Sequence, residues 1–333
     1  MSANRFDSVC IIGPVVADVT AGPVSPDVFS TGSHAISHTS LSFGGDALNE
    51  AVVLSRLGAP VELISKVGND ETGHRLLSFL ADNRVETAGV ITEEGLTTGI
   101  NIVLFDKNGE RFFLTNPNSS LRKLGLSDVQ NAVSSLPFLR SSRTLFSFAS
   151  IFVSPLFGIK EMKELFHSLK MQPGNVLCAD FTKAKNGETL QDLYEILPYT
   201  DIVFPNEEEI ALLTHESDPS KNAASLLKAG VSCVVIKCGK KGCLIRTENE
   251  EITIPSVSGI TPLDTTGAGD NFVAGFLYGL YHGYPLPECG KLACATASCA
   301  VETIGANSGV VSLAEPARRA EQIIPVFSSV PVV

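Results

Sequence analysis

Hydrophobic residues alternate along the chain between short continuous runs and stretches with helical spacing. The continuous runs predict buried β-strands at 8–13, 61–67, 145–148, 176–180, 202–204 and 231–237. Helical spacing predicts helices at 47–57, 159–169, 190–197 and 271–281. Strands that alternate with helices usually form a mostly parallel sheet with helices on both faces. The pattern therefore predicts an α/β fold.

Two regions break this alternation. Residues 15–43 are rich in Thr, Ser, Gly and Pro and have no clear helical period, whereas 97–115 predict two strands joined at the hairpin signal Lys107-Asn108-Gly109. We expect both regions to form a small β lid over the carboxyl edge of the sheet, where open α/β folds bind ligands. We predict one domain, 1–333, with its core at about 1–14, 44–96 and 119–325 and its lid at about 15–43 and 97–118.

The segment Asp264–Asp270, with the sequence Asp-Thr-Thr-Gly-Ala-Gly-Asp, runs directly into a predicted helix. Its glycines allow backbone angles that turn consecutive N–H groups into one concavity, and a helix N-terminus favours an anion there. Asp270 falls in the first helical turn, where it would accept the proton of an attacking hydroxyl. The alternative is a capped turn whose last carboxylate only complements the helix dipole. The candidate catalytic residues are Asp270, Gly267, Ala268 and Gly269.

A second motif lies near the N-terminus. Gly44-Gly45-Asp46-Ala47-Leu48-Asn49-Glu50-Ala51 is followed by Gly58 and Gly68. Together with Asp264–Asp270, it resembles the two signatures of the PfkB (ribokinase-like) carbohydrate kinases, and Pro205–Glu209 and Val234–Gly242 resemble intervening family motifs. The resemblance implies a ribokinase-like three-layer α/β/α sandwich with a mostly parallel central sheet and a small β lid. It also implies transfer of the γ-phosphate of ATP to a sugar hydroxyl, with Mg²⁺.

The resemblance also implies where the acceptor binds. The candidate substrate-binding residues are Asp18, Gly44, Gly45, Asp46, Asn49 and Arg111. Without the family match, Asp18 would be read as a turn residue and Asn49 as a helix-face amide. Arg111 could equally be a solvated strand arginine. Two pocket carboxylates disfavour an acidic acceptor unless Arg111 and Lys66 offset them, so we predict a neutral monosaccharide or polyol.

Nucleotide and metal residues follow from the same resemblance. The candidate nucleotide-binding residues are Asn206, Lys237, Gly239, Gly242, Thr266, Gly267 and Gly269, with Cys294 near the adenine. Asn206 and Glu209 would hold Mg²⁺ through water. Asp180 would join this network or cap its strand. The region that binds K⁺ in some members corresponds to Asp264, Thr266, Ala300, Thr303, Gly305 and Gly309.

Composition narrows the possible partners. The 333-residue chain is 44% hydrophobic and carries a formal charge of −11, which argues against a nucleic-acid partner. No apolar run approaches the ~20 residues that span a bilayer, so we expect no membrane partner. The first residues do not resemble a signal peptide, so we expect a cytoplasmic protein with its eight cysteines as buried free thiols.

Other functions remain open at this point. A nucleoside kinase of the same fold would need an aromatic pocket, and the chain is only 7% aromatic without tryptophan. A non-catalytic sugar sensor would not need Asp270. A Rossmann dehydrogenase would need Gly-x-Gly-x-x-Gly after the first strand, and Gly13-Pro14-Val15 does not fit. An exposed lid edge could pair two copies of the chain into a homodimer.

Overall fold

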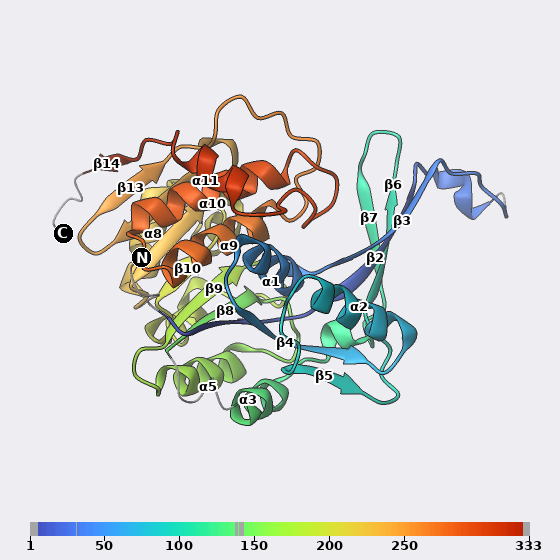
Figure 1. Ribbon diagram of the computed structural model, residues 1–333, viewed down its shortest axis with the longest axis horizontal. Coiled ribbons are helices and arrows are strands. Elements are labelled where there is room, and N and C mark those ends of the chain that lie inside the picture. Colours follow the sequence, from blue (N-terminus) through green and yellow to red (C-terminus); the bar gives the residue numbers. More distant parts are fainter. Residues whose placement is uncertain (1–5, 31, 137–138, 140–142, 329–333) are drawn as a thin grey trace.

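The computed structural model describes residues 6–30, 32–136, 139 and 143–328. An open sheet with helices on both sides forms the body, and a smaller sheet stands at one end (Figure 1). The fold is therefore of the predicted α/β class. The first five and last five residues of the predicted domain lie outside the described part, and its bounds remain a prediction.

The larger sheet carries the site. Its strands are β1 (Ser8–Ile12), β4 (Val61–Gly68), β5 (Val90–Glu93), β8 (Thr144–Ile151), β9 (Val176–Phe181), β10 (Ile202–Phe204), β11 (Cys233–Lys237), β12 (Cys243–Thr247), β13 (Glu251–Ile254) and β14 (Val326–Ser328). Within the described residues their order is β14-β13-β12-β11-β10-β9-β8-β1-β4-β5. Strands β11 to β5 pair in parallel, whereas β12, β13 and β14 extend the sheet antiparallel.

Helices cover both faces of this sheet. They are α1 (Asp46–Leu57), α2 (Glu71–Asp82), α3 (Leu126–Ser135), α5 (Ile159–Lys170), α6 (Leu190–Leu193), α7 (Glu207–Thr214), α8 (Pro219–Lys228), α9 (Ala268–Tyr281), α10 (Leu286–Ala300) and α11 (Ala314–Ala320). Strand residues alternate between the two faces. In β1, Val9 and Ile11 join a core with α1, α2, α9 and α10, whereas Cys10 and Ile12 join a core with α3, α5, α7 and α8. The result is a three-layer sandwich.

The smaller sheet contains β2 (Val16–Gly22), β3 (His38–Gly44), β6 (Ile100–Phe105) and β7 (Arg111–Thr115), in the order β3-β2-β6-β7. All four strands come from the two segments that break the strand–helix alternation. The β6–β7 hairpin stands beside the C-terminal part of the body (Figure 1). A small β lid is therefore present, as predicted, and its 3₁₀ turn at Pro26–Phe29 had no sequence signal.

Two predicted helices have different bounds in the structure. The helix expected over 190–197 is only α6, and a separate 3₁₀ turn follows at Leu197–Tyr199. Pro198 explains this break, because proline lacks an N–H and disfavours helical backbone in the residue before it. The helix expected from Asn271 begins three residues earlier, at Ala268, which places Asp270 inside the first turn.

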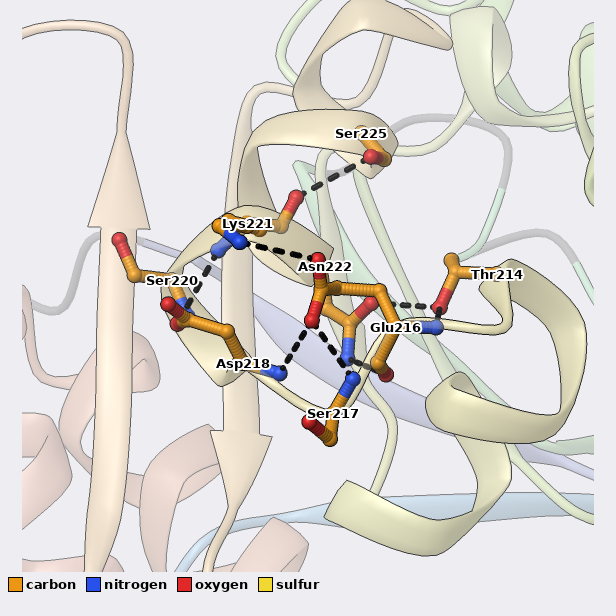
Figure 2. Close-up of polar contacts among 8 residues, drawn as sticks. All are labelled: Thr214, Glu216, Ser217, Asp218, Ser220, Lys221, Asn222 and Ser225. Atoms are coloured by element: carbon orange, nitrogen blue, oxygen red, sulfur yellow. Dashed lines mark hydrogen bonds and ion pairs between the residues drawn. The ribbon is translucent and has the colours of Figure 1, made fainter.

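The corner between α7 and α8 is fixed by a dense polar network (Figure 2). Asp218 caps α8 by accepting hydrogen bonds from the backbone N–H groups of Ser220 and Lys221. The buried side chain of Asn222 bonds to the Thr214 hydroxyl at 2.5 Å and donates to the Glu216 carbonyl at 3.0 Å. These contacts lock the C-terminal end of α7, whose N-terminus lies at the site.

None of the helices in the described part of the chain combines the length and apolar character needed to cross a lipid bilayer.

Candidate functional site

Two cavities meet where β11 ends and α9 begins. The larger, of about 470 Å³, is lined by Gly242, Ala268 and Cys294 among others. The smaller, of about 310 Å³, is lined by Asp46, Asp180, Phe181, Asn206, Glu209 and Asp270 among others. Lys237, Gly239 and Gly269 line both cavities. A ligand that spans the two cavities would therefore pass these three residues.

The turn before α9 is held in one shape. Gly267 has a left-handed φ of 72°, and a Cβ built on it would lie 2.5 Å from the Ala306 carbonyl oxygen. The Asn271 side-chain amide donates to the Gly267 and Ala306 carbonyls, each at 2.7 Å. The Ala268 N–H donates to the Thr265 carbonyl at 3.2 Å. The first turn of a helix leaves N–H groups without intrahelical partners, so this turn presents positive dipole ends to the cavities.

Asp270 lies partly buried beside α1. Its Oδ2 accepts a hydrogen bond from the Asn49 side-chain amide at 2.7 Å. Asn49 Oδ1 in turn accepts from Asn307 at 2.9 Å, which orients the Asn49 amide. Burial and the nearby Asp46 carboxylate raise the pKa of Asp270 well above its usual range, although the Asn49 bond opposes this shift. The two signatures, far apart in sequence, thus meet through a direct contact.

Among the described residues that line the smaller cavity, one is a lysine, Lys237, and it lies among several carboxyl groups. Lys237 Nζ is 2.5 Å from Asp180 Oδ1, and the two side chains are only 12% and 3% exposed. Burial lowers the pKa of Lys237, but Asp180 and Glu209 outweigh this effect and raise it above its usual range. A Cβ built on Gly269 would lie 3.4 Å from Nζ. A buried ammonium therefore stays charged next to the turn before α9.

Asn206 and Glu209 form a capping box at the start of α7. Asn206 Oδ1 accepts from the Glu209 N–H, and Glu209 Oε2 accepts from the Asn206 N–H, both at 2.8 Å. Burial raises the pKa of Glu209 to about 7, against the opposing charge of Lys237. Both residues also line the smaller cavity. The structure therefore gives them a structural role beside the predicted metal role.

Three of the acceptor candidates, Asp18, Gly44 and Asn49, lie together, and Asn49 contacts Asp270. A Cβ built on Gly44 would lie 3.0 Å from Asp18 Oδ2 and 3.8 Å from Asn49 Oδ1. Asp18 Oδ1 accepts from the Asn101 amide at 2.9 Å, which ties the two lid strands β2 and β6 together. Gly45 turns into α1 with φ 95°. Glycine at 44 therefore leaves room beside the Asp18 carboxylate that a side chain would take.

Three residues considered for the acceptor pocket have other partners. Asp46 accepts from the Ser150 hydroxyl at 2.8 Å and lies with the acidic residues of the smaller cavity. Arg111 reaches the turn before α9, where it contacts Asp264 and Thr266. The suggestion that Lys66 offsets pocket carboxylates is wrong, because Lys66 pairs with Glu93 at 2.9 Å and Asp128 at 2.8 Å. This pair network lies along β4, β5 and α3.

The predicted K⁺ region lies around Asp264. Its carboxylate accepts from the Thr266 N–H at 3.0 Å and hydroxyl at 2.7 Å, and from the Gly305 N–H at 3.1 Å. Arg111 Nη2 lies 3.2 Å from the same carboxylate. Burial raises the pKa of Asp264, but the bonds from Thr266, Gly305 and Arg111 outweigh it and lower the pKa. The Thr303 N–H donates to the Ala300 carbonyl at 3.3 Å, and a Cβ on Gly309 would lie 2.8 Å from Ala300 Cα.

Direct metal coordination has little support among side chains. Within the described residues, no group of three or more His, Cys, Asp or Glu side chains is arranged to hold an ion. Magnesium usually keeps several waters and takes few protein ligands, so the acidic wall of the smaller cavity still fits a hydrated Mg²⁺.

All eight cysteines carry free thiols, and Cys238 is the one that is only partly buried.

Sequence reasoning missed three polar residues at the site. Asn271 directly follows Asp270, and its position in the motif was the available signal. Asn101 is a polar residue between Ile100 and Ile102 in a predicted lid strand, and this polar position in an apolar stretch was the available signal for it. Asn307 lies in a loop where no local pattern distinguishes it from its neighbours.

Comparison with known proteins identifies the family. Residues 7–312 match the family described as pfkB family carbohydrate kinase. A protein named uncharacterized sugar kinase from Archaeoglobus fulgidus is 34% identical over 271 residues, which cover 77% of this chain and 97% of that protein. Both matches extend over most of the chain, and the family match includes both signatures.

Solved structures share the fold. Arabidopsis thaliana ribokinase, complexed with ribose and ATP, superposes with a TM-score of 0.76 at 21% identity and covers 94% of this chain and 98% of that one. Phosphofructokinase-2 from Escherichia coli, in complex with potassium, gives 0.75 at 20% identity and covers 95% and 98%. The chain belongs to the PfkB family and is a sugar kinase with the ribokinase fold.

Proposed function

We propose that this protein transfers the γ-phosphate of ATP to a hydroxyl of a neutral monosaccharide or polyol, with Asp270 as the general base. The contact between Asn49 and Asp270 carries this proposal, because it joins the residues around Gly44 and Asp18 to the smaller cavity, which Asp270 lines. A hydroxyl bound among these residues would lie beside the carboxylate that takes its proton. The phosphate would approach from the side of Gly269.

The larger cavity suits the nucleotide. At about 470 Å³ it lies within the range of small-molecule sites, and its wall is mostly apolar apart from Lys237 and Lys240. A base and ribose there would direct the phosphates toward Lys237 and Gly269, which line both cavities. The N–H groups at the start of α9 and the Lys237 ammonium would stabilise the charge on the transferring phosphoryl group.

Mg²⁺ fits the smaller cavity. Among its described lining residues, Asp46, Asp180, Glu209 and Asp270 accompany one lysine, so in their ionised forms they would carry negative charge in excess of the ammonium. Asn206 and Glu209 would hold the ion through its waters. The bound ion supplies charge neutralisation for the phosphate oxygens.

The acceptor side favours a neutral ligand. Asp18 and Asn101 offer hydrogen-bonding groups to a polyol, and a carboxylate can accept two bonds from vicinal hydroxyls. Lys66 and Arg111 could have offset the charge of an acidic acceptor. Both instead pair with carboxylates outside the acceptor pocket. An already phosphorylated sugar would therefore meet uncompensated negative charge.

Asp270 must be ionised to act as a base. Burial and Asp46 raise its pKa, which favours the protonated acid in the free protein. The Asn49 amide and the Lys237 ammonium oppose this effect. Cations that enter with the nucleotide would add to them, so Asp270 would become an active base when the donor is bound.

A substrate panel tests the proposal. Purified protein would be assayed for ADP release with Mg–ATP and a range of neutral sugars, polyols, sugar phosphates and nucleosides. Acceptor-dependent turnover with neutral sugars supports the proposal. Turnover restricted to nucleosides would favour the nucleoside kinase instead. Sugar binding without any ADP release would favour a non-catalytic sensor.

The lid also supports the predicted homodimer. One face of its sheet carries Asp18 and Asn101, and the opposite face presents the half-exposed apolar side chains of Leu41, Ile102, Phe112 and Leu114. Contiguous exposed apolar surface usually marks an interface. Light scattering of the wild type and of Leu41→Glu tests this. A dimer that becomes a monomer in the variant supports lid pairing, and a monomeric wild type contradicts it.

A further inference from the structure

Asp264 places a carboxylate directly before Thr265, which lines the larger cavity together with Ala268 and Gly269 of the proposed phosphate site. Its side chain is 8% exposed, and it begins the seven-residue segment that ends at Asp270. Through Thr266 on one side and Gly305 on the other, the carboxylate links this turn to the loop after α10. A carboxylate at this position repels a triphosphate unless a cation offsets it.

The structure provides that cation from the lid. Arg111, the first residue of β7, extends across to the body. Nη2 lies 3.2 Å from Asp264 Oδ2, and Nη1 donates to the Thr266 hydroxyl. The guanidinium therefore contacts both ends of the Asp264–Thr266 turn. Arg111 thus ties the tip of the lid to the turn before α9.

The same contacts leave few oxygen atoms free to bind a monovalent ion. A cation needs oxygen ligands, but two backbone N–H groups, from Thr266 and Gly305, point at the Asp264 carboxylate together with the arginine. The Ala300 and Gly305 carbonyls accept from the N–H groups of Thr303 and Ser308 at 3.3 and 3.5 Å. In this arrangement the Arg111 guanidinium already supplies the positive charge that K⁺ would bring to the predicted region.

We propose that Arg111 takes the place of a monovalent cation at Asp264 and so makes nucleotide binding depend on lid closure rather than on K⁺. When the lid is closed, the guanidinium neutralises Asp264 and the turn before α9 attracts phosphate. When the lid opens, Asp264 loses its partner and repels the triphosphate. Arg111 is a positioning residue in this scheme, since it acts through the turn. The inference rests on the proposed binding of phosphate at that turn.

An ordinary surface ion pair is the competing explanation. Arg111 is 36% exposed, and pairs of this kind contribute little to stability. If the pair had no other role, the affinity of the Arg111→Ala variant for nucleotide would not depend on K⁺. Response to K⁺ after removal of the arginine therefore separates the two explanations.

The experiment measures affinity for a non-hydrolysable ATP analogue by calorimetry, in tetramethylammonium buffer with and without KCl. The wild type should bind equally in both buffers. Arg111→Ala should bind roughly tenfold more weakly without K⁺, the effect of one lost charge-assisted contact, and should recover when K⁺ is added. Arg111→Lys should retain most of the affinity. Asp264→Asn combined with Arg111→Ala should lose the response to K⁺.

Arg75→Ala is the matched control, because Arg75 forms an exposed pair with Glu71 on α2, away from the turn. It should behave like the wild type. A wild type whose affinity requires K⁺, or an Arg111→Ala variant that is unaffected or not rescued by K⁺, overturns the inference. Analogue binding does not require phosphoryl transfer, so inactivity of the wild type toward every sugar would reject the proposed function alone.

Discussion

The α7–α8 corner and the smaller cavity are both rich in carboxylates, but they use them in opposite ways. At the corner, Glu216 accepts from the N–H groups of Ser217 at 2.8 Å and Asp218 at 3.0 Å (Figure 2). These bonds, led by that from Asp218, lower the pKa of Glu216. In the cavity, burial raises the pKa of Asp270 and of Glu209.

The opposite pKa shifts separate acids that stabilise the fold from acids that we expect to bind a ligand. Carboxylates at the corner are exposed and satisfied by the backbone, so their charge stabilises the local fold. Of the four carboxyl groups that line the cavity, that of Asp180 is buried and the others are partly buried, and among the described lining residues they face one ammonium, that of Lys237. Fully ionised, they would outnumber this cation. Buried excess charge is costly unless a cation or proton arrives. We therefore expect cavity substitutions to change activity and corner substitutions to change stability.

Replacement of Asp270 by Asn should have the largest effect. The amide keeps the size of the side chain but cannot accept the hydroxyl proton, so kcat should fall on the order of 1,000-fold. Affinity for an ATP analogue should change little. Steady-state assays and calorimetry measure both quantities. A variant with near-normal kcat would reject Asp270 as the base.

Replacement of Lys237 by Met should have the next largest effect. The variant removes the one ammonium that lines both cavities, so kcat/KM for ATP should fall on the order of 100-fold. Lys241→Met is the matched control, because Lys241 lies four residues after Lys237, in the 3₁₀ turn that follows β11, and pairs near the surface with Glu207 of α7. Equal losses in the two variants would show that Lys237 has no special role.

The Mg²⁺ requirement should depend on pH around neutrality. Because burial raises the pKa of Glu209 to about 7, the acid becomes protonated as the pH falls through 7, and a protonated acid attracts Mg²⁺ less. The Mg²⁺ concentration for half-maximal rate should rise toward low pH, by at most about tenfold per pH unit. Glu209→Gln should flatten this dependence. A requirement that is constant between pH 6 and 8 would contradict the assignment.

Replacement of Asp218 by Ala should affect only stability. The variant removes the N-cap of α8, which typically lowers the free energy of unfolding by about 1 kcal/mol. Denaturant unfolding measures this loss, and kcat should remain at the wild-type value. A large loss of activity at unchanged stability would remove the distinction between corner and cavity.

The sequence predicted most of the parallel part of the sheet because its strands are largely apolar runs, as in Ile202–Phe204. The parallel edge strand β5 was not predicted, because it is short and partly exposed. The lid was predicted from its hairpin turn. The antiparallel extension, β12 to β14, was not predicted, because these strands are short and partly polar. The early end of α6 depends on Pro198, which periodicity alone does not take into account.

At the site, the two signatures predicted the residues that the structure brings together, Asn49 and Asp270 above all. Side-chain partners were harder to predict. Lys66 turns to Glu93 and Asp128, and Arg111 turns to Asp264, because tertiary packing decides which acid a long cation reaches. The same holds for Asn307, whose contact with Asn49 spans most of the chain.

We expect the acids of the smaller cavity to become fully ionised only when the Mg–nucleotide complex binds. Calorimetric proton counting tests this expectation directly: a preformed Mg–ATP analogue is titrated into the protein at pH 7 in buffers of different ionisation enthalpy. We predict proton release, with roughly half a proton from Glu209 alone, and a correspondingly smaller release in Glu209→Gln. Heats that do not depend on the buffer, or a release that Glu209→Gln leaves unchanged, would contradict the account.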